Sequence, residues 1–149
     1  MTSLKRTNSD DKDFRNLVNL LDNDLAIRDG EDHAFYNQFN KTDKIKHVIV
    51  FYENDIAAGC GAFREKQTDI VEIKRMYVQP DHRKKGFATA ILKELEIWAK
   101  EVGYTYTILE TGKNQPEAIS LYQKLNYTII PNYPPYENVD NSVCMKKTL

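Results

Sequence analysis

Near the start of the chain, apolar residues recur every three or four positions, which is the spacing of one face of a helix. The positions concerned are Phe14, Leu17, Val18, Leu21 and Leu25. The polar residues Asn8–Asp11 offer side chains that can cap such a helix at its start, and Gly30 can end it. The pattern also predicts a short strand at Ser3–Thr7 and a second short helix at Asp32–Phe39.

In the middle of the chain, β-branched and aromatic residues form three runs that are separated by short polar turns. The runs are Ile45–Glu53, Ile56–Glu65 and Asp69–Val78. Sequential strands joined by such short turns usually pair side by side, so we predict an antiparallel meander. Pro80 lacks the amide hydrogen that a sheet requires, and it ends the third run.

Helical and strand-like segments alternate in the second half of the chain. A helix that follows Pro80 and ends at Gly103 has a long apolar face. The inward positions of this helix are Ala88, Ile91, Leu92, Leu95, Trp98, Ala99 and Val102. The next segments are a strand at Tyr104–Thr111, a helix at Asn114–Leu125, and strands at Tyr127–Ile130 and Ser142–Lys147. Strands first and crossover helices later indicate an α/β fold.

The composition indicates the number of domains and the kinds of partner that are not expected. The 149 residues contain no repeat and no linker-like segment, so a single domain over residues 1–149 is expected. The 21 basic and 22 acidic residues give a net charge of -1, which disfavours nucleic acid or an anionic membrane as a partner. No apolar run approaches about 18 residues, and the polar start has no apolar signal segment. A cytoplasmic protein that does not span a membrane is expected.

The two cysteines suggest neither a redox site nor a metal site. Cys60 and Cys144 lie far apart and have no CxxC spacing or neighbouring histidine pair. We therefore expect two buried thiols in strands and no bound metal.

The segment His82–Leu95, HRKKGFATAILKEL, places a basic turn with a glycine directly before a helix. The start of a helix carries unpaired amide hydrogens and a partial positive charge, so it binds phosphate well. Gly86 lets a ligand approach the backbone closely. The cations beside it are Arg83, Lys84 and Lys85. A solvated basic turn is the alternative, but uncompensated positive charge at a helix start is unfavourable by roughly 0.3–1 kcal/mol.

Two segments carry a family resemblance. Arg83–Ala88 (RKKGFA) resembles the R/Q-x-x-G-x-G/A signature of the GNAT superfamily of N-acetyltransferases, in which this turn binds the pyrophosphate of acetyl-CoA. Leu109–Tyr127 resembles the second cofactor motif of that family, and the order of the predicted elements is the GNAT order along nearly the whole chain. The resemblance implies the GNAT (acyl-CoA N-acyltransferase) fold, with a central mixed sheet of about seven strands flanked by about four helices.

The resemblance implies acetyl-CoA as the co-substrate and assigns residues to its binding. They are Met76, Tyr77, Val78, Arg83, Lys84, Lys85, Gly86, Phe87, Ala88, Thr89, Asn114, Ala118 and Tyr122. Met76, Tyr77 and Val78 lie on one predicted strand. In the family, this strand has a bulge near its end and separates there from the next parallel strand. That separation leaves backbone amides, here around Tyr77 and Val78, for the thioester carbonyl and the pantetheine arm.

The chain departs from the family pattern at two positions: Ala88 replaces a glycine often found in the first motif, which the signature allows, and Asn126 follows the helix of the second motif. Asn114 and Glu117, three residues apart, resemble a capping pair at the start of that helix, with Pro116 at an early helical position. Asn126 replaces a glycine that many members have after this helix. Asparagine tolerates the left-handed conformation next best, so the helix is still expected to stop there.

Two residues are candidates for the proton transfers of acetylation. An aliphatic amine with a pKa of about 10.4 is mostly protonated at neutral pH, and the resemblance implies Glu72 as its base. A salt bridge from Glu72 to Lys74 on the same strand face is the competing interpretation. The resemblance also implies that Tyr122 protonates the departing CoA thiolate, although Tyr122 lies in an apolar helical stripe that equally fits a core residue.

The predicted function is acetyl-CoA-dependent acetylation of a primary amine by direct transfer in a ternary complex, because neither cysteine has an activating neighbour in the sequence. A small-molecule or amino-acid-like acceptor is favoured. The rigid loop Pro131–Asn138 is expected to contact it through Tyr133 or Tyr136. A peptide or protein acceptor, a non-catalytic acyl-CoA sensor and a homodimer all stay open.

Overall fold

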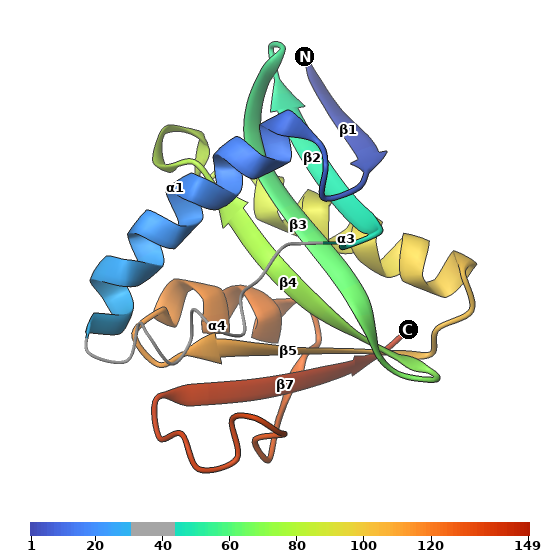
Figure 1. The fold of residues 1–149 in the computed structure, drawn as a ribbon, viewed down its shortest axis with the longest axis vertical. Helices are drawn as coiled ribbons and strands as arrows, with labels where there is room; N and C mark the ends of the chain where they lie inside the picture. The colour runs from blue at the N-terminus through green and yellow to red at the C-terminus, as the bar shows by residue number, and fades with distance from the viewer. Residues whose placement is uncertain (31–43) are drawn as a thin grey trace.

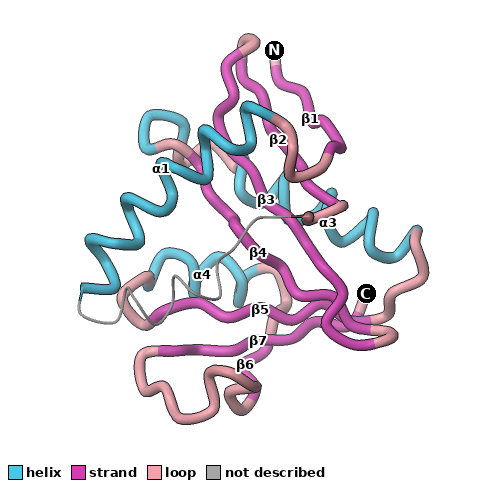
Figure 2. Tube along the Cα trace, in the orientation of Figure 1, coloured by secondary structure: helices cyan, strands magenta, loops and turns pink. Residues whose placement is uncertain are grey.

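The computed structural model describes residues 1–30 and 44–149, so the predicted helix at Asp32–Phe39 lies outside the described residues. One mixed sheet of seven strands runs in the order β1-β2-β3-β4-β5-β7-β6 (Figure 1; Figure 2). The strands are β1 (Thr2–Thr7), β2 (His47–Glu53), β3 (Ile56–Gln67), β4 (Ile70–Val78), β5 (Tyr106–Gly112), β6 (Thr128–Ile130) and β7 (Ser142–Thr148). The helices are α1 (Lys12–Asp29), α3 (Phe87–Glu101), α4 (Pro116–Lys124) and the short 3-10 helix η2 (Pro80–His82). None of these helices is long and apolar enough to cross a membrane.

The first helix begins and ends as predicted. The Asp11 carboxylate accepts a hydrogen bond of 3.1 Å from the Phe14 amide, and Gly30 ends the helix with a φ of 54°. The predicted apolar face packs on one side of β2, β3 and β4 (Figure 1). This cluster contains Phe14, Leu17, Val18 and Leu21 of α1 together with Val48, Val50, Cys60, Ala62 and Tyr77 of the sheet.

Helix α3 covers the opposite face of the sheet at close range. A Cβ atom on Gly61 of β3 would lie 2.9 Å from side-chain atoms of both Ile91 and Leu95. Only glycine permits this approach, which explains the glycines of β3. One predicted inward position is wrong: Val102 caps the end of the helix and is 47% exposed, because α3 ends at Glu101 before the face returns to the sheet.

The antiparallel meander of β2, β3 and β4 is confirmed, and the sheet opens beyond it. Parallel pairing of β4 with β5 joins Ile70–Glu72 only to Tyr106–Ile108. Farther along, the two strands diverge, as the widening gap between β4 and β5 in Figure 1 shows. Just past the last pair, Arg75 and Met76 stand opposite the single residue Gly61 of β3 and form a β-bulge. The expected bulge and separation are therefore both present.

The second motif folds as a helix, but not with the predicted cap. The N-terminal capping position of α4 is Gln115, and no side chain caps it. The Asn114 amide instead donates a hydrogen bond of 3.1 Å to the Arg28 carbonyl, and Glu117 forms an ion pair with Arg28. The capping pair is therefore wrong, because α1 competes for both side chains. Asn126 ends the helix with a left-handed φ of 75°, as expected.

Candidate active site

A cleft of about 110 Å³ lies where β4 diverges from β5. Helix α1 lines one side of it through Leu21 and Leu25, and α4 lines it through Ala118 and Tyr122. The remaining lining residues are Glu72, Ile73, Lys74, Arg75, Met76, Leu109, Glu110, Thr111, Gly112 and Gln115. Acidic and basic side chains thus meet at a place where the sheet offers unpaired strand edges.

The start of α3 has the features of an anion-binding turn. Gly86 stands at the N-terminal capping position with a left-handed φ of 81°, and no side chain caps the helix there. The first turn of α3 holds no acidic residue. The amide hydrogens of this turn and the positive end of the helix dipole are therefore available to a phosphate group.

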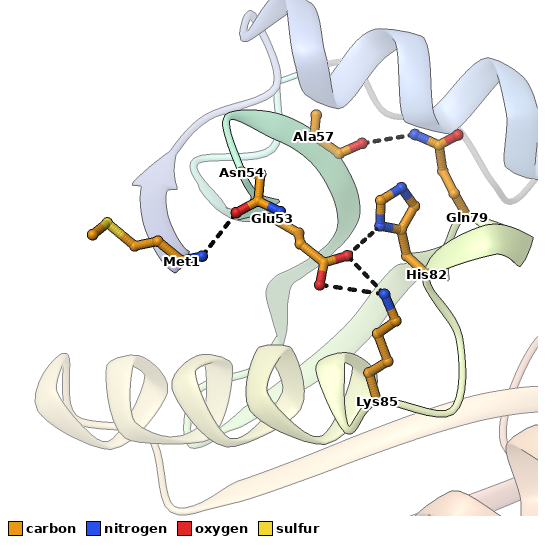
Figure 3. Close-up of polar contacts among 7 residues, drawn as sticks. All are labelled: Met1, Glu53, Asn54, Ala57, Gln79, His82 and Lys85. Atoms are coloured by element: carbon orange, nitrogen blue, oxygen red, sulfur yellow. Dashed lines mark hydrogen bonds and ion pairs between the residues drawn. The ribbon is translucent and has the colours of Figure 1, made fainter.

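Glu53 at the end of β2 holds two of the basic residues of this turn (Figure 3). Its carboxylate lies 2.7 Å from His82 Nδ1 and 3.1 Å from Lys85 Nζ. Hydrogen bonds from His82 and then from Lys85 lower the pKa of Glu53. Lys85 is therefore already paired with an acid, which leaves less free positive charge than the sequence suggested.

The other two cations differ in their surroundings. Arg83 Nε donates a hydrogen bond of 2.8 Å to the Val78 carbonyl, so its side chain folds back onto the end of β4. Lys84 is exposed, has a left-handed φ of 65°, and has no ion-pair partner within the described part of the chain. One free lysine beside an anchored arginine suits a single phosphate site better than an extended nucleic-acid surface.

Glu72 is buried at the junction where β4 and β5 separate. Only 3% of the residue is exposed, and its Oε2 accepts a hydrogen bond of 2.7 Å from the Tyr133 hydroxyl. It forms an ion pair with Arg64 on β3, at 3.8 Å. Burial lowers the pKa of the Lys74 ammonium, and the nearby Glu72 carboxylate opposes that effect.

Tyr122 belongs both to the core and to the cleft. It is 6% exposed, packs edge-on against Tyr127 with ring centroids 5.8 Å apart, and lines the cleft. Burial and the nearby Glu110 carboxylate raise the pKa of its phenol. The two interpretations of Tyr122 are therefore compatible, and its hydroxyl stays protonated at any pH at which the protein would work.

The loop residues predicted to contact the acceptor have different environments. The Tyr133 hydroxyl reaches Glu72, and burial followed by that carboxylate raises the pKa of Tyr133. Tyr136 is 2% exposed and packs with Cys144 in a small core of its own. The Tyr133 hydroxyl therefore contacts a candidate catalytic residue, whereas Tyr136 anchors the loop through its buried ring.

The predicted cofactor residues fall into three groups. Arg83, Lys84, Lys85, Gly86, Phe87, Ala88 and Thr89 form the turn and the first turn of α3. Met76, Ala118 and Tyr122 line the cleft. Tyr77 and Val78 are buried in the cores on opposite faces of the sheet, so only their backbone is placed to bind a ligand. Asn114 lies beside the cleft with its amide nitrogen bonded to α1.

The sequence did not single out three charged residues that the fold brings to this region. Glu110 and Arg75 line the cleft, and Arg64 faces Glu72 across the β3–β4 register. A lone acid in the otherwise uncharged strand Tyr104–Thr111 was a usable signal for Glu110. No signal marked Arg64, because strand register is a tertiary property.

Both cysteines are buried and free, as predicted. Burial raises the pKa of the Cys60 thiol to about 12 and that of the Cys144 thiol to about 11. Within residues 1–30 and 44–149, no three His, Cys, Asp or Glu side chains come together as a metal-ligand set.

Comparison with known proteins agrees with this geometry. The model of the acetyltransferase (GNAT) family matches residues 13–127. YsnE of Bacillus subtilis, described as an uncharacterised N-acetyltransferase, is 35% identical over 100 residues, which cover 66% of this chain and 66% of that protein. The chain thus matches slightly less than two thirds of the length of this relative.

Solved structures match over the whole chain. A protein from Klebsiella pneumoniae assigned as an acyl-CoA N-acyltransferase has a TM-score of 0.83 and 26% identity, covering 100% of this chain and 98% of its own. A GNAT family acetyltransferase from Elizabethkingia anophelis with acetyl-CoA bound has a TM-score of 0.70 and 18% identity, covering 99% of this chain and 98% of its own. On the family match and this shared fold, the chain belongs to the GNAT family of acetyltransferases.

Proposed function

We propose that this protein transfers the acetyl group of acetyl-CoA to a primary amine of a small-molecule acceptor, by direct transfer in a ternary complex. The observation that carries the proposal is the cleft between β4 and β5, with the uncapped start of α3 close to the end of β4 and with Glu72 and Tyr122 in its walls. The solved relative with acetyl-CoA bound shares this fold. Family membership supports the reaction type, and the site supports the roles.

The start of α3 and the free edge of β4 suit two parts of acetyl-CoA. The pyrophosphate would bind the amide hydrogens around Gly86, with Lys84 and Arg83 beside it. The pantetheine arm is a chain of amides, and it would pair with the edge of β4 beyond Glu72, where β5 no longer does. This path leads the thioester to the bulge of β4.

Glu72 would remove a proton from the acceptor ammonium. The neutral amine then attacks the thioester carbonyl, and the carbonyl oxygen becomes an oxyanion near the β4 bulge. The hydrogen bond from Tyr133 occupies one oxygen of Glu72, which orients the carboxylate. The other oxygen, with Arg64 3.8 Å away, keeps a lone pair for the amine proton.

Tyr122 would assist the leaving thiolate as a hydrogen-bond donor. When the C–S bond breaks, the electron pair goes to sulfur. A phenol with a raised pKa gives up its proton to a thiolate less readily than an ordinary phenol, because a thiol has a pKa of about 8.5. The thiolate is therefore stabilised by the Tyr122 hydroxyl and takes its proton from the nitrogen of the tetrahedral intermediate or from water.

Direct transfer is favoured over an acetyl-cysteine intermediate. Both thiols are buried and have raised pKa values, so little thiolate is present at neutral pH. Intact mass measurement after incubation with acetyl-CoA alone should show no acetyl adduct. A stoichiometric adduct lost on adding an amine would contradict direct transfer.

The proposed function is tested by measuring CoA thiol release from acetyl-CoA with a panel of primary amines and lysine-containing peptides. Release should require an amine and should yield an equal amount of N-acetyl product. If acetyl-CoA raises the melting temperature but no amine supports release, the protein is an acyl-CoA sensor. If only peptides are acetylated, the small-molecule acceptor is wrong.

A further inference from the structure

Arg75, at the bulge of β4, has an unusual backbone conformation. Its φ of 59° is a left-handed value that residues other than glycine, asparagine and aspartate seldom adopt. Backbone strain of this kind persists where the surrounding structure enforces it, and it is concentrated at functional sites. Arg75 is one of the residues that line the cleft, so the strained position belongs to the candidate active site.

The guanidinium of Arg75 is buried but not fully hydrogen-bonded. Its side chain is 1% exposed, and one terminal nitrogen forms an ion pair with Asp22 of α1. Its Nε has no hydrogen-bond partner among the residues that the structure describes. A buried donor without an acceptor is unfavourable, and a guanidinium commonly binds a carboxylate through two adjacent donors. The Nε–H of Arg75 is therefore a buried donor that lacks an acceptor among the described residues.

The charges of the cleft lining indicate what kind of ligand this is. The described lining contains two acids, Glu72 and Glu110, and two bases, Lys74 and Arg75. The proposed function places the ammonium of the acceptor beside Glu72. A diamine would add only positive charge to a balanced site, whereas a molecule with one ammonium and one carboxylate would preserve the balance.

We propose that the acceptor is a zwitterionic amine of the amino-acid type and that Arg75 Nε binds its carboxylate. This inference rests on the proposed function and names the chemical class of its acceptor. Arg75 is a substrate-binding residue in this account, and Asp22 holds its guanidinium in place from α1.

The test compares kcat/KM for the proteinogenic α-amino acids and for their α-carboxamides, which keep the amine and remove the negative charge. The native protein should prefer the best amino acid over its amide by about tenfold or more, since a hydrogen bond to a charged group is lost with the amide. Arg75→Gln should bring this ratio close to one by raising KM for the acids. Arg75→Lys should restore part of the preference, because it keeps the charge but not the Nε donor.

Asp22→Asn is the matched control, because it removes the charge of the ion pair but keeps the Oδ1 acceptor that holds the guanidinium, and it leaves the Nε donor of Arg75 in place. The preference for the acid should persist in this variant. The ratio of kcat/KM for the acid to kcat/KM for the amide is measured on one preparation of each variant. The fraction of folded protein therefore cancels from this ratio. Equal rates for acids and amides in the native protein, or an unchanged ratio in Arg75→Gln, would overturn the inference and leave amine acetylation intact. Absence of turnover with both series, while another small primary amine supports CoA release, would also overturn the inference and leave the proposed function intact.

Discussion

At the scale of single residues, the acid-base assignment depends on a buried carboxylate with one hydrogen-bond donor. Glu72→Gln preserves the volume of the side chain and removes the base. The acidic limb of the pH–rate profile should disappear and kcat should fall by roughly 10²–10⁴-fold, the usual contribution of a general base. Steady-state rates from acidic to neutral pH measure both effects.

Tyr133→Phe provides the control for Glu72. This variant removes the hydroxyl that lies 2.7 Å from Glu72 but leaves the carboxylate in place. Its acidic limb should therefore remain. If the acidic limb of the pH–rate profile persists in Glu72→Gln, another group is the base.

Tyr122→Phe tests the role of the phenol in thiolate departure. The substitution keeps the ring that packs against Tyr127 and removes the hydroxyl. We expect kcat to fall by about tenfold or more, with unchanged affinity for acetyl-CoA, because the hydroxyl acts only as the C–S bond breaks. Single-turnover rates and calorimetric titration distinguish the two quantities.

The neighbouring Tyr127→Phe is the matched control for this prediction. The Tyr127 hydroxyl is bonded to Thr107 at 2.8 Å and to Glu96 at 2.9 Å, away from the cleft. Its loss should lower the melting temperature and leave kcat unchanged. If Tyr122→Phe behaves in the same way, Tyr122 is a core residue only.

At the scale of secondary-structure elements, the two ends of α3 offer a test of the phosphate turn. Gly86 precedes the helix and Gly103 follows it; both have a positive φ, and a Cβ atom at either would meet nothing within 4 Å. Gly86→Glu and Gly103→Glu should therefore share a strain cost of about 1–2 kcal/mol. Only Gly86→Glu should abolish acetyl-CoA binding in calorimetry, because it alone places negative charge at the helix start. If both variants bind acetyl-CoA with equal affinity, the pyrophosphate does not bind at this turn.

On β2, His47 predicts a pH dependence of stability. The imidazole stacks on Phe63 at 4.5 Å and meets Trp98 edge-on at 4.7 Å. Burial, with a smaller effect of Lys46, lowers the pKa of His47 below 6.5. The folded protein then binds fewer protons than the unfolded chain below about pH 6.5, so the free energy of unfolding should fall as the pH falls.

Urea unfolding followed by the fluorescence of Trp98, the single tryptophan, measures this dependence. His47→Gln should be less stable at neutral pH, because it loses the ring contacts, but its stability should change less between about pH 7 and pH 5. Identical pH slopes for the two proteins would show that His47 is protonated equally in the folded and unfolded states.

At the scale of the whole molecule, features that depend on neighbouring residues in the sequence could be predicted, and features that depend on contacts between distant residues were missed. Periodicity is local, so the helix from Lys12, the meander and the helix from Phe87 could all be predicted. The capping pair Asn114 and Glu117 failed because Arg28, far away in the chain, engages both side chains. The contact of Glu72 with Arg64 could not be predicted either, because strand register fixes that partner.

The candidate site shows the same division. The turn before α3 could be found from consecutive residues, since the glycine and the cations adjoin one another in the chain. The cleft could not, because it arises where two strands distant in sequence stop pairing. Arg75 was hidden for a further reason: nothing in its identity signals a left-handed backbone.

The central claim is that acetyl-CoA binds along the β4 edge of this cleft with its pyrophosphate at the start of α3. Amide hydrogen exchange with and without acetyl-CoA tests this location without knowledge of the acceptor. Protection should appear in peptides covering residues 73–78 and 83–89, while β1 and the first half of β2 should be unchanged. Protection confined to other segments, or none at saturating acetyl-CoA, would contradict the account.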